Sequence, residues 1–88
     1  MKLADYLRPL STQQRTELAQ RAGTSFLHLR NVAFSSKKCG IPLAVALERE
    51  TGGVVRRWDL RDDWALLWPE LVGLPDAPTV PELERAAA

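Results

Sequence analysis

The sequence predicts a small all-α domain of about five short helices. Apolar residues recur at helical spacing in most segments, and cap residues, glycines and prolines stand where those segments begin or end. The one candidate strand is the stretch 54–57, whose two adjacent valines are weak evidence for extended structure. A chain of 88 residues makes a single domain, and its core must be small.

The first two predicted helices are bounded by a proline and by hydroxyl side chains. Residues 3–10 carry apolar side chains at helical spacing, and Pro9 ends this helix because proline cannot continue one. Ser11 or Thr12 caps the second helix, since a hydroxyl oxygen can accept a hydrogen bond from an unpaired amide of the first turn. This helix runs to about Ala22.

A glycine separates the second helix from the third. Gly23 is typical of the left-handed residue that ends a helix, and Thr24 or Ser25 then caps a third helix over residues 26–34. Pro42 predicts a fourth helix, because proline is tolerated in a first turn, and a pair of glycines ends that helix ten residues later.

The C-terminal third is rich in tryptophan and then in proline. Residues 59–73 predict one or two short helices, with Trp64 and Trp68 on one helical face. The two rings either close the small core or form a dimer surface, since aromatic residues are enriched in interfaces. Residues 74–88 have three prolines within seven residues and little to bury, which predicts a flexible tail after a domain of residues 1–73.

The second and third helices match the helix-turn-helix pattern. A small residue is followed four positions later by glycine, and aliphatic residues stand six and nine positions beyond that glycine: Ala19, Gly23, Leu29 and Val32. The small Ala19 lets the two helices cross closely, and Gly23 supplies the positive φ of a tight turn. Such a unit holds its second helix clear of the surface, where it can enter the major groove of DNA.

The outer side of the third helix carries the residues predicted to contact DNA bases: Ser25, Phe26, Leu27, Arg30 and Asn31. Arginine can pair bidentately with guanine and asparagine with adenine, and each pairing is worth about 1–3 kcal/mol of discrimination. The residues predicted to contact phosphates are Gln13, Gln14, His28, Lys37 and Lys38. For His28, a surface position without a role is an equal alternative.

The formal charge is divided along the chain. Residues 1–57 carry ten Lys and Arg against four Asp and Glu, a charge of +6, whereas residues 58–88 carry two against seven, a charge of −5. A basic body with an acidic end suits binding of a polyanion, and chance clustering in a short chain is the alternative. Arg56 and Arg57 either flank the DNA or are simply solvated.

Four motifs carry a family resemblance. They are G-T-S-x-x-H-L-R-N-V-A at residues 23–33, L-A-x-A-L-E-R-E-T-G-G at residues 43–53, W-D-L-R at residues 58–61 and D-W-x-x-x-W-P-E-L-V-G at residues 63–73. Over residues 1–73 the chain resembles the small Cro-like prophage regulators of the YdaS type. The resemblance implies a compact, mainly helical domain related to the phage repressor fold.

The resemblance also implies a function. Members of this family look like transcription factors that bind operator DNA, and some are described as antitoxins beside a toxin partner. Position by position, the resemblance puts the same five residues of the third helix at the DNA-reading positions. The chain departs from the family at Asp62, where relatives often have proline after the arginine, and this leaves the start of the last helix open.

Together these observations predict a Cro-like transcriptional regulator. We expect it to occupy an operator on double-stranded DNA as a homodimer and to read the major groove with its third helix. The rival prediction is a protein-interaction module, an antitoxin or antirepressor, that grips a protein through the apolar side chains of Phe26, Leu27 and Phe34. A toxin is the candidate partner in that case.

Several other classes of function are not expected. The single cysteine, Cys39, excludes an internal disulfide, and with the single histidine, His28, it cannot build a zinc site. Cys39 lacks a neighbouring base and is predicted to be inert, so we expect no enzymatic role, cofactor or small-molecule ligand. No segment resembles a signal peptide or a membrane span, which predicts a cytoplasmic protein.

Overall fold

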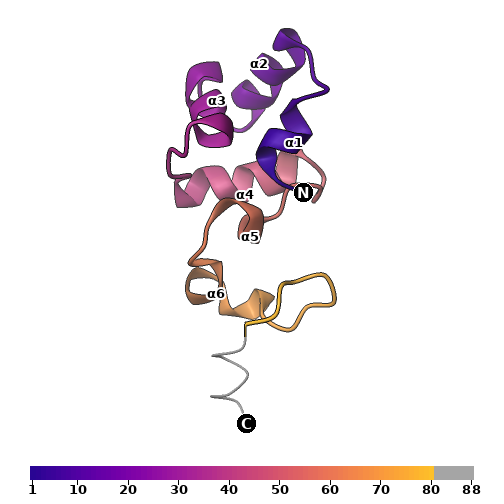
Figure 1. The fold of residues 1–88 in the computed structure, drawn as a ribbon, viewed down its shortest axis with the longest axis vertical. Coiled ribbons are helices and arrows are strands. Elements are labelled where there is room, and N and C mark those ends of the chain that lie inside the picture. The colour runs from indigo at the N-terminus through magenta and orange to yellow at the C-terminus, as the bar shows by residue number, and fades with distance from the viewer. Residues whose placement is uncertain (81–88) are drawn as a thin grey trace.

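The computed structural model describes residues 1–80, which form six short α-helices, one 3-10 helix and no strand (Figure 1). The elements are α1 (Leu3–Leu7), α2 (Thr12–Arg21), α3 (Phe26–Phe34), α4 (Ile41–Glu50), α5 (Arg57–Leu60), α6 (Trp64–Leu67) and the 3-10 helix η1 (Pro69–Leu71). The all-α fold class is therefore confirmed. The stretch 54–57 is not a strand, because Val54 and Val55 lie in a bend and Arg57 already begins α5.

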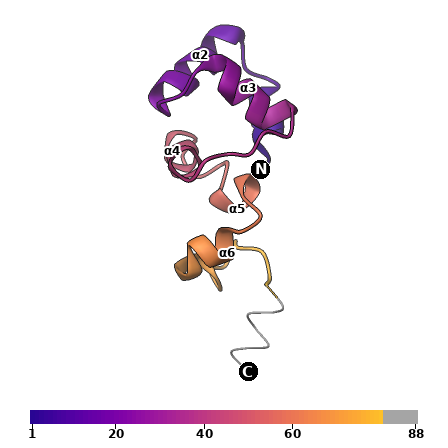
Figure 2. The same ribbon diagram turned by 90° about the vertical axis from the view of Figure 1, so that its left-hand side faces the viewer.

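Helix α4 lies across the middle of the molecule (Figures 1 and 2). Helices α1, α2 and α3 are grouped on one side of it, with α3 packed against both α1 and α2, and α2 packed against α4. Helices α5 and α6 follow on the other side, where α5 packs against α4. No helix within residues 1–80 has the length and apolar character needed to cross a membrane.

The hydrophobic core joins these elements through a few fully buried side chains. Leu7, Leu18, Leu29 and Leu47 come from four different helices, and each is at most 1% exposed. Val55, in the connection between α4 and α5, is also fully buried. Because each helix is short, its position depends on packing against the others rather than on its own helical stability.

Side-chain caps set the starts of α2 and α3. The Ser11 hydroxyl accepts a hydrogen bond from the Gln14 amide (3.1 Å), and the Gln14 side chain accepts one from the Ser11 amide (2.8 Å), which completes a capping box. The Ser25 hydroxyl accepts a hydrogen bond from the His28 amide (3.1 Å) at the start of α3. Of the predicted alternatives, Ser11 and Ser25 are thus the caps, and Pro42 lies in the first turn of α4 as predicted.

The tryptophans close the core. Trp64 and Trp68 are 7% and 9% exposed and belong to the central cluster, while the Trp58 ring packs edge-on against Trp64 with 5.6 Å between centroids. The structure therefore supports the core alternative for Trp64 and Trp68, because little of either ring is left for an interface. Leu66, between them in the sequence, is 80% exposed.

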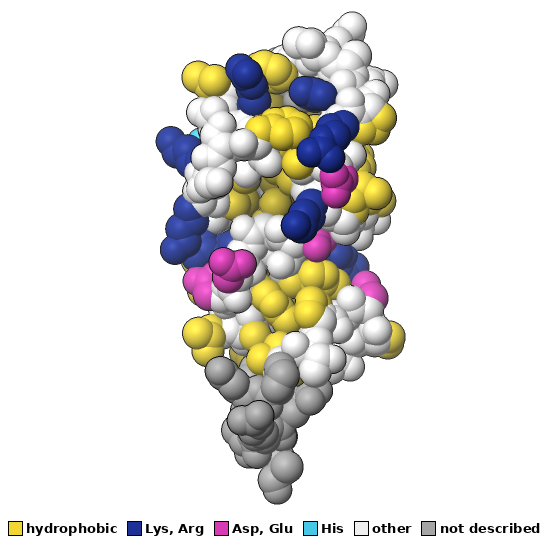
Figure 3. Space-filling view, in the orientation of Figure 1, with side chains coloured by type: hydrophobic (Ala, Val, Ile, Leu, Met, Phe, Trp, Pro, Cys, Tyr) yellow, Lys and Arg dark blue, Asp and Glu magenta, His cyan; other side chains and the backbone are white. Residues whose placement is uncertain are grey.

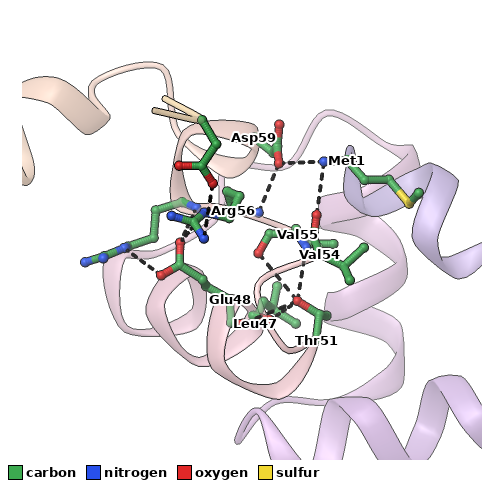
Figure 4. A network of polar contacts seen from close by, with 10 residues as sticks. Met1, Leu47, Glu48, Thr51, Val54, Val55, Arg56 and Asp59 are labelled. Carbon is green, nitrogen blue, oxygen red and sulfur yellow. Dashed lines mark hydrogen bonds and ion pairs between the residues drawn. The ribbon is translucent and has the colours of Figure 1, made fainter. Parts of the chain in front are cut away.

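Arg56 and Arg57 both form ion pairs with Glu48. Figure 4 shows Arg56 beside the Glu48 carboxylate. The Glu48 carboxylate lies 3.5 Å from Arg56 Nε and 3.3 Å from Arg57 Nε, close enough for ion pairing but not aligned for hydrogen bonds. The two guanidinium groups also cover the rings of Trp58 and Trp68, at 4.5 and 5.1 Å from the centroids. The side chains of Arg56 and Arg57 are only 25% and 19% exposed, so the alternative that they are simply solvated is wrong, and a place beside the DNA stays a prediction.

The first part of the proline-rich segment, up to residue 80, packs against the domain. Asp76 Oδ2 lies 3.6 Å from Arg56 Nη1, and Ala77 and Val80 are partly buried against the core. Residues 81–88 lie outside the described residues, so flexibility of that part of the predicted tail stays a prediction.

Thr51 links the end of α4 to the segment that follows it (Figure 4). It is 6% exposed, and its hydroxyl donates a hydrogen bond to the Leu47 carbonyl (2.7 Å) and accepts one from the Val55 amide (3.1 Å). A buried amide that loses its acceptor costs about 1–3 kcal/mol. The hydroxyl therefore stabilises the turn that brings Val55 into the core.

We expect Thr51→Val to lower the free energy of unfolding by about 1–3 kcal/mol, because the Val55 amide is left without a partner. Urea unfolding followed by tryptophan fluorescence measures the change. Thr16→Val is the matched control, since the Thr16 hydroxyl makes only one hydrogen bond, an exposed one to the Thr12 carbonyl, and we expect a loss within about 0.5 kcal/mol. Equal losses in the two variants would show that the buried hydroxyl does not stabilise the turn.

Candidate nucleic-acid interface

The turn between α2 and α3 has the geometry that the helix-turn-helix pattern requires. Gly23 has a φ of +78°, in the left-handed region, and the Thr24 amide donates a hydrogen bond to the Ala19 carbonyl (2.9 Å). Ala19 itself is 1% exposed. A small buried side chain at this position allows α3 to pack directly on α2. The turn at Gly23 changes the direction of the chain between the two helices within a few residues.

Helix α3 has a buried side and an outer side. Leu29 is 1% exposed, and Val32 and Ala33 pack against the core on the same side. Arg30 is exposed and Asn31 is half-buried. The prediction that the turn directs Arg30 outward is confirmed, and Asn31 reaches the surface in part.

The other predicted base-contacting residues lie at the start of α3. Ser25 is exposed, but its hydroxyl oxygen is occupied as the helix cap. Phe26 is half-buried, and Leu27 is 60% exposed. The start of α3 therefore presents an apolar surface beside the arginine.

The predicted phosphate-contacting residues lie in three places. Gln13 and Gln14 are exposed at the start of α2, where Gln14 also completes the capping box and Gln13 donates a hydrogen bond to Glu17 (3.4 Å). Lys37 and Lys38 are exposed in the connection between α3 and α4. His28, on α3, is half-buried.

Unpaired positive charge gathers around α3 and the connection that follows it. Within residues 1–80, neither Arg30, Lys37 nor Lys38 forms an ion pair, whereas Arg21 and Arg49 both pair with Glu50. Figure 3 shows Lys and Arg side chains along the left edge of the molecule, over α3 and the α3–α4 connection, with acidic side chains directly below them. The surface thus changes sign where the helix-turn-helix unit meets the lower part of the fold.

A cleft of about 490 Å³ lies at this boundary. Its lining includes three lysines, Lys2, Lys37 and Lys38, together with Arg61, and three acidic residues, Asp59, Asp62 and Asp63. Sequence reasoning missed Lys2, which stands 35 positions before Lys37 and is brought to it by the packing of α1 against α3. No local pattern around Lys2 indicates this.

Cys39 also lines the cleft but is 2% exposed. Burial raises the pKa of its thiol to about 11, and the positive charge of Arg61 opposes only part of that shift. The thiol is therefore protonated at neutral pH and is a poor nucleophile. Among residues 1–80, no group of three or more His, Cys, Asp or Glu side chains is placed to hold a metal ion.

Arg15 is a second residue that sequence reasoning missed. Its Nε donates a hydrogen bond to the Leu7 carbonyl (3.0 Å), and its guanidinium lies 5.8 Å from the centroid of the Phe34 ring. It thereby connects α1, α2 and α3. Phe34 remains 43% exposed on the outer side of α3.

We expect Gly23→Ala to lower the free energy of unfolding by about 1–2 kcal/mol, because an L-residue with a side chain is strained at positive φ. No heavy atom lies within 4 Å of a Cβ built on Gly23, so crowding adds nothing to this strain. Gly23→Asn is the matched control and should lose less, since asparagine adopts the left-handed region more readily. Chemical denaturation measures both variants, and equal losses would contradict a conformational cause.

No protein-family model matches the chain, and no curated protein does so either.

Proposed function

We propose that this chain is a sequence-specific DNA-binding transcriptional regulator that reads the major groove with α3. One observation carries the proposal: Arg30 stands exposed beside the fully buried Leu29, on a helix held by a tight turn, and has no ion partner within residues 1–80. A guanidinium in that position is suited to a bidentate contact with guanine.

The remaining outer residues of α3 fit the same role. Asn31 can pair with adenine to the extent that it is exposed, and Leu27 can pack against a thymine methyl group. Lys37 and Lys38 supply phosphate contacts, which position the protein but carry no sequence information. Apart from the aspartates that line the cleft, the acidic residues of the lower part would lie away from the DNA.

One short helix reads only a few base pairs, so the proposal includes two copies of the chain on a two-fold operator. Their α3 helices would then lie about 34 Å apart, in successive major grooves. Occupancy of a promoter by such a dimer would block or modulate RNA polymerase. The resemblance of residues 1–73 to YdaS-type prophage regulators supports this reading, and a Cro-like repressor is the specific form that we propose.

Arg30→Ala tests the proposal directly. Selection of bound sequences from random duplexes first identifies an operator, and an inverted repeat is expected from a two-fold dimer. The variant should then lose about 1–3 kcal/mol of operator affinity, measured by fluorescence anisotropy, because a bidentate base contact is removed.

Arg49→Ala is the matched control for Arg30→Ala. Arg49 is also an exposed helical arginine, but it lies on α4 and pairs with Glu50. Operator affinity should be unchanged in this variant. A fully folded Arg30→Ala protein that binds the operator as tightly as the wild type would overturn the assignment of Arg30 to base reading.

A second function is favoured by the apolar side chains beside Arg30. Leu27 and Phe34 are 60% and 43% exposed on α3, as expected of a surface that grips another protein. In that case the chain would act as an antitoxin or antirepressor, with a toxin as one candidate partner.

Salt dependence separates the two functions. Binding to duplex DNA releases counterions, so we expect the affinity to fall steeply, by about a thousandfold or more between 50 and 200 mM salt, if six or more phosphates are contacted. An interaction through Leu27 and Phe34 would depend far less on salt. Absence of any duplex binding at 50 mM salt would leave the protein-interaction function as the better reading.

A further inference from the structure

All three lysines of the sequence line one cleft, although they come from opposite ends of the helix-turn-helix region. Lys2 precedes α1, whereas Lys37 and Lys38 follow α3, and every other basic side chain apart from His28 is an arginine. The three lysines are exposed, and none of them forms an ion pair within residues 1–80. We call this feature the lysine cleft.

Two of the three acidic residues that line the lysine cleft are already held by other groups. The Asp59 carboxylate accepts hydrogen bonds from the Arg56 amide and the Met1 amino group, both at 3.0 Å (Figure 4). Asp63 accepts two hydrogen bonds from the Arg61 side chain, both at 2.9 Å.

Asp62 differs from its two acidic neighbours. It is exposed, and within the described part of the chain its carboxylate forms neither an ion pair nor a hydrogen bond. Asp62 therefore supplies the one unneutralised negative charge in the lining of the lysine cleft.

Lys38 and Asp63 are close enough for the charge of one to influence the other. The pKa of Asp63 is lowered, mainly by its hydrogen bonds from Arg61, and the positive charge of Lys38 adds to the effect. A volume of about 490 Å³ corresponds to a sphere roughly 10 Å across, and charges at that separation are barely screened at about 0.01 M salt, where the Debye length is about 30 Å.

We propose that the lysine cleft binds a phosphate of the DNA backbone, with Lys2 as a third ligand beside Lys37 and Lys38, and that Asp62 opposes this phosphate and limits the affinity. The proposal rests on the proposed function, since duplex DNA is the ligand. Lysine suits this task because an ammonium group binds phosphate as a compact charge without a fixed geometry. A contact of this kind acts equally on every DNA sequence.

Two charge changes test the site with duplex DNA of unrelated sequence. At about 0.01 M salt, Lys2→Gln should weaken binding about twofold to fivefold, and Asp62→Asn should strengthen it by a similar factor. Lys2→Gln should also reduce the slope of log affinity against log salt by about 1. Both effects should shrink as salt is raised, and the ratio of operator to unrelated-duplex affinity should stay the same.

Glu70→Gln is the matched control for Asp62→Asn. It removes the same charge from an exposed residue of η1 that does not line the lysine cleft, and it should change the affinity less. Wild-type affinity in both Lys2→Gln and Asp62→Asn, with operator binding intact, would overturn this inference and leave the proposed function standing. Absence of duplex binding by the wild type would overturn both.

Lysine acetylation gives a direct readout of contact, because every lysine of the chain belongs to the site. The wild type is treated with an acetylating ester, with and without saturating duplex, and modification is read by mass spectrometry. DNA should protect Lys2 together with Lys37 and Lys38. Unchanged acetylation of Lys2 in the saturated complex would show that it is not a phosphate ligand.

Discussion

The burial of Leu29 against the core sets the orientation of the whole candidate interface. Helix α3 turns by about 100° per residue, so fixing Leu29 inside directs the next side chain, Arg30, toward solvent. The close packing of α3 on α2 at Ala19, and the left-handed Gly23 between them, hold that rotation in place. If α3 were free to roll about its axis, no single side chain could be presented reliably to a groove.

The distribution of usable charge differs from the formal charge. Residues 1–57 carry +6, but Glu48 and Asp76 offset the charges of Arg56 and Arg57, and Arg21 and Arg49 share Glu50. The positive charge left unpaired within the described residues lies mainly around α3 and the lysine cleft. A polyanion would therefore meet a small, well-defined basic surface rather than a uniformly basic body.

The outer side of α3 combines one arginine with two exposed apolar side chains, Leu27 and Phe34. Arginine and apolar groups can both read bases in a major groove, and the same combination is common at protein interfaces. What favours DNA is the surroundings of the helix, where the lysines are unpaired. A protein-binding surface would not need three lysines gathered beside it.

The sequence by itself determined the helices, the caps at Ser11 and Ser25 and the sidedness of α3. These features depend on contacts within a few residues, through capping hydrogen bonds and a 3.6-residue period that the order of side chains already contains. Only the tertiary structure decided that Trp64 and Trp68 close the core. The same holds for the ion pairs of Glu48 with two arginines, and for the cleft that Lys2 and Lys37 both line. The residues in these contacts are far apart in the sequence, so no local pattern predicts them. The contacts form only when the short helices pack together.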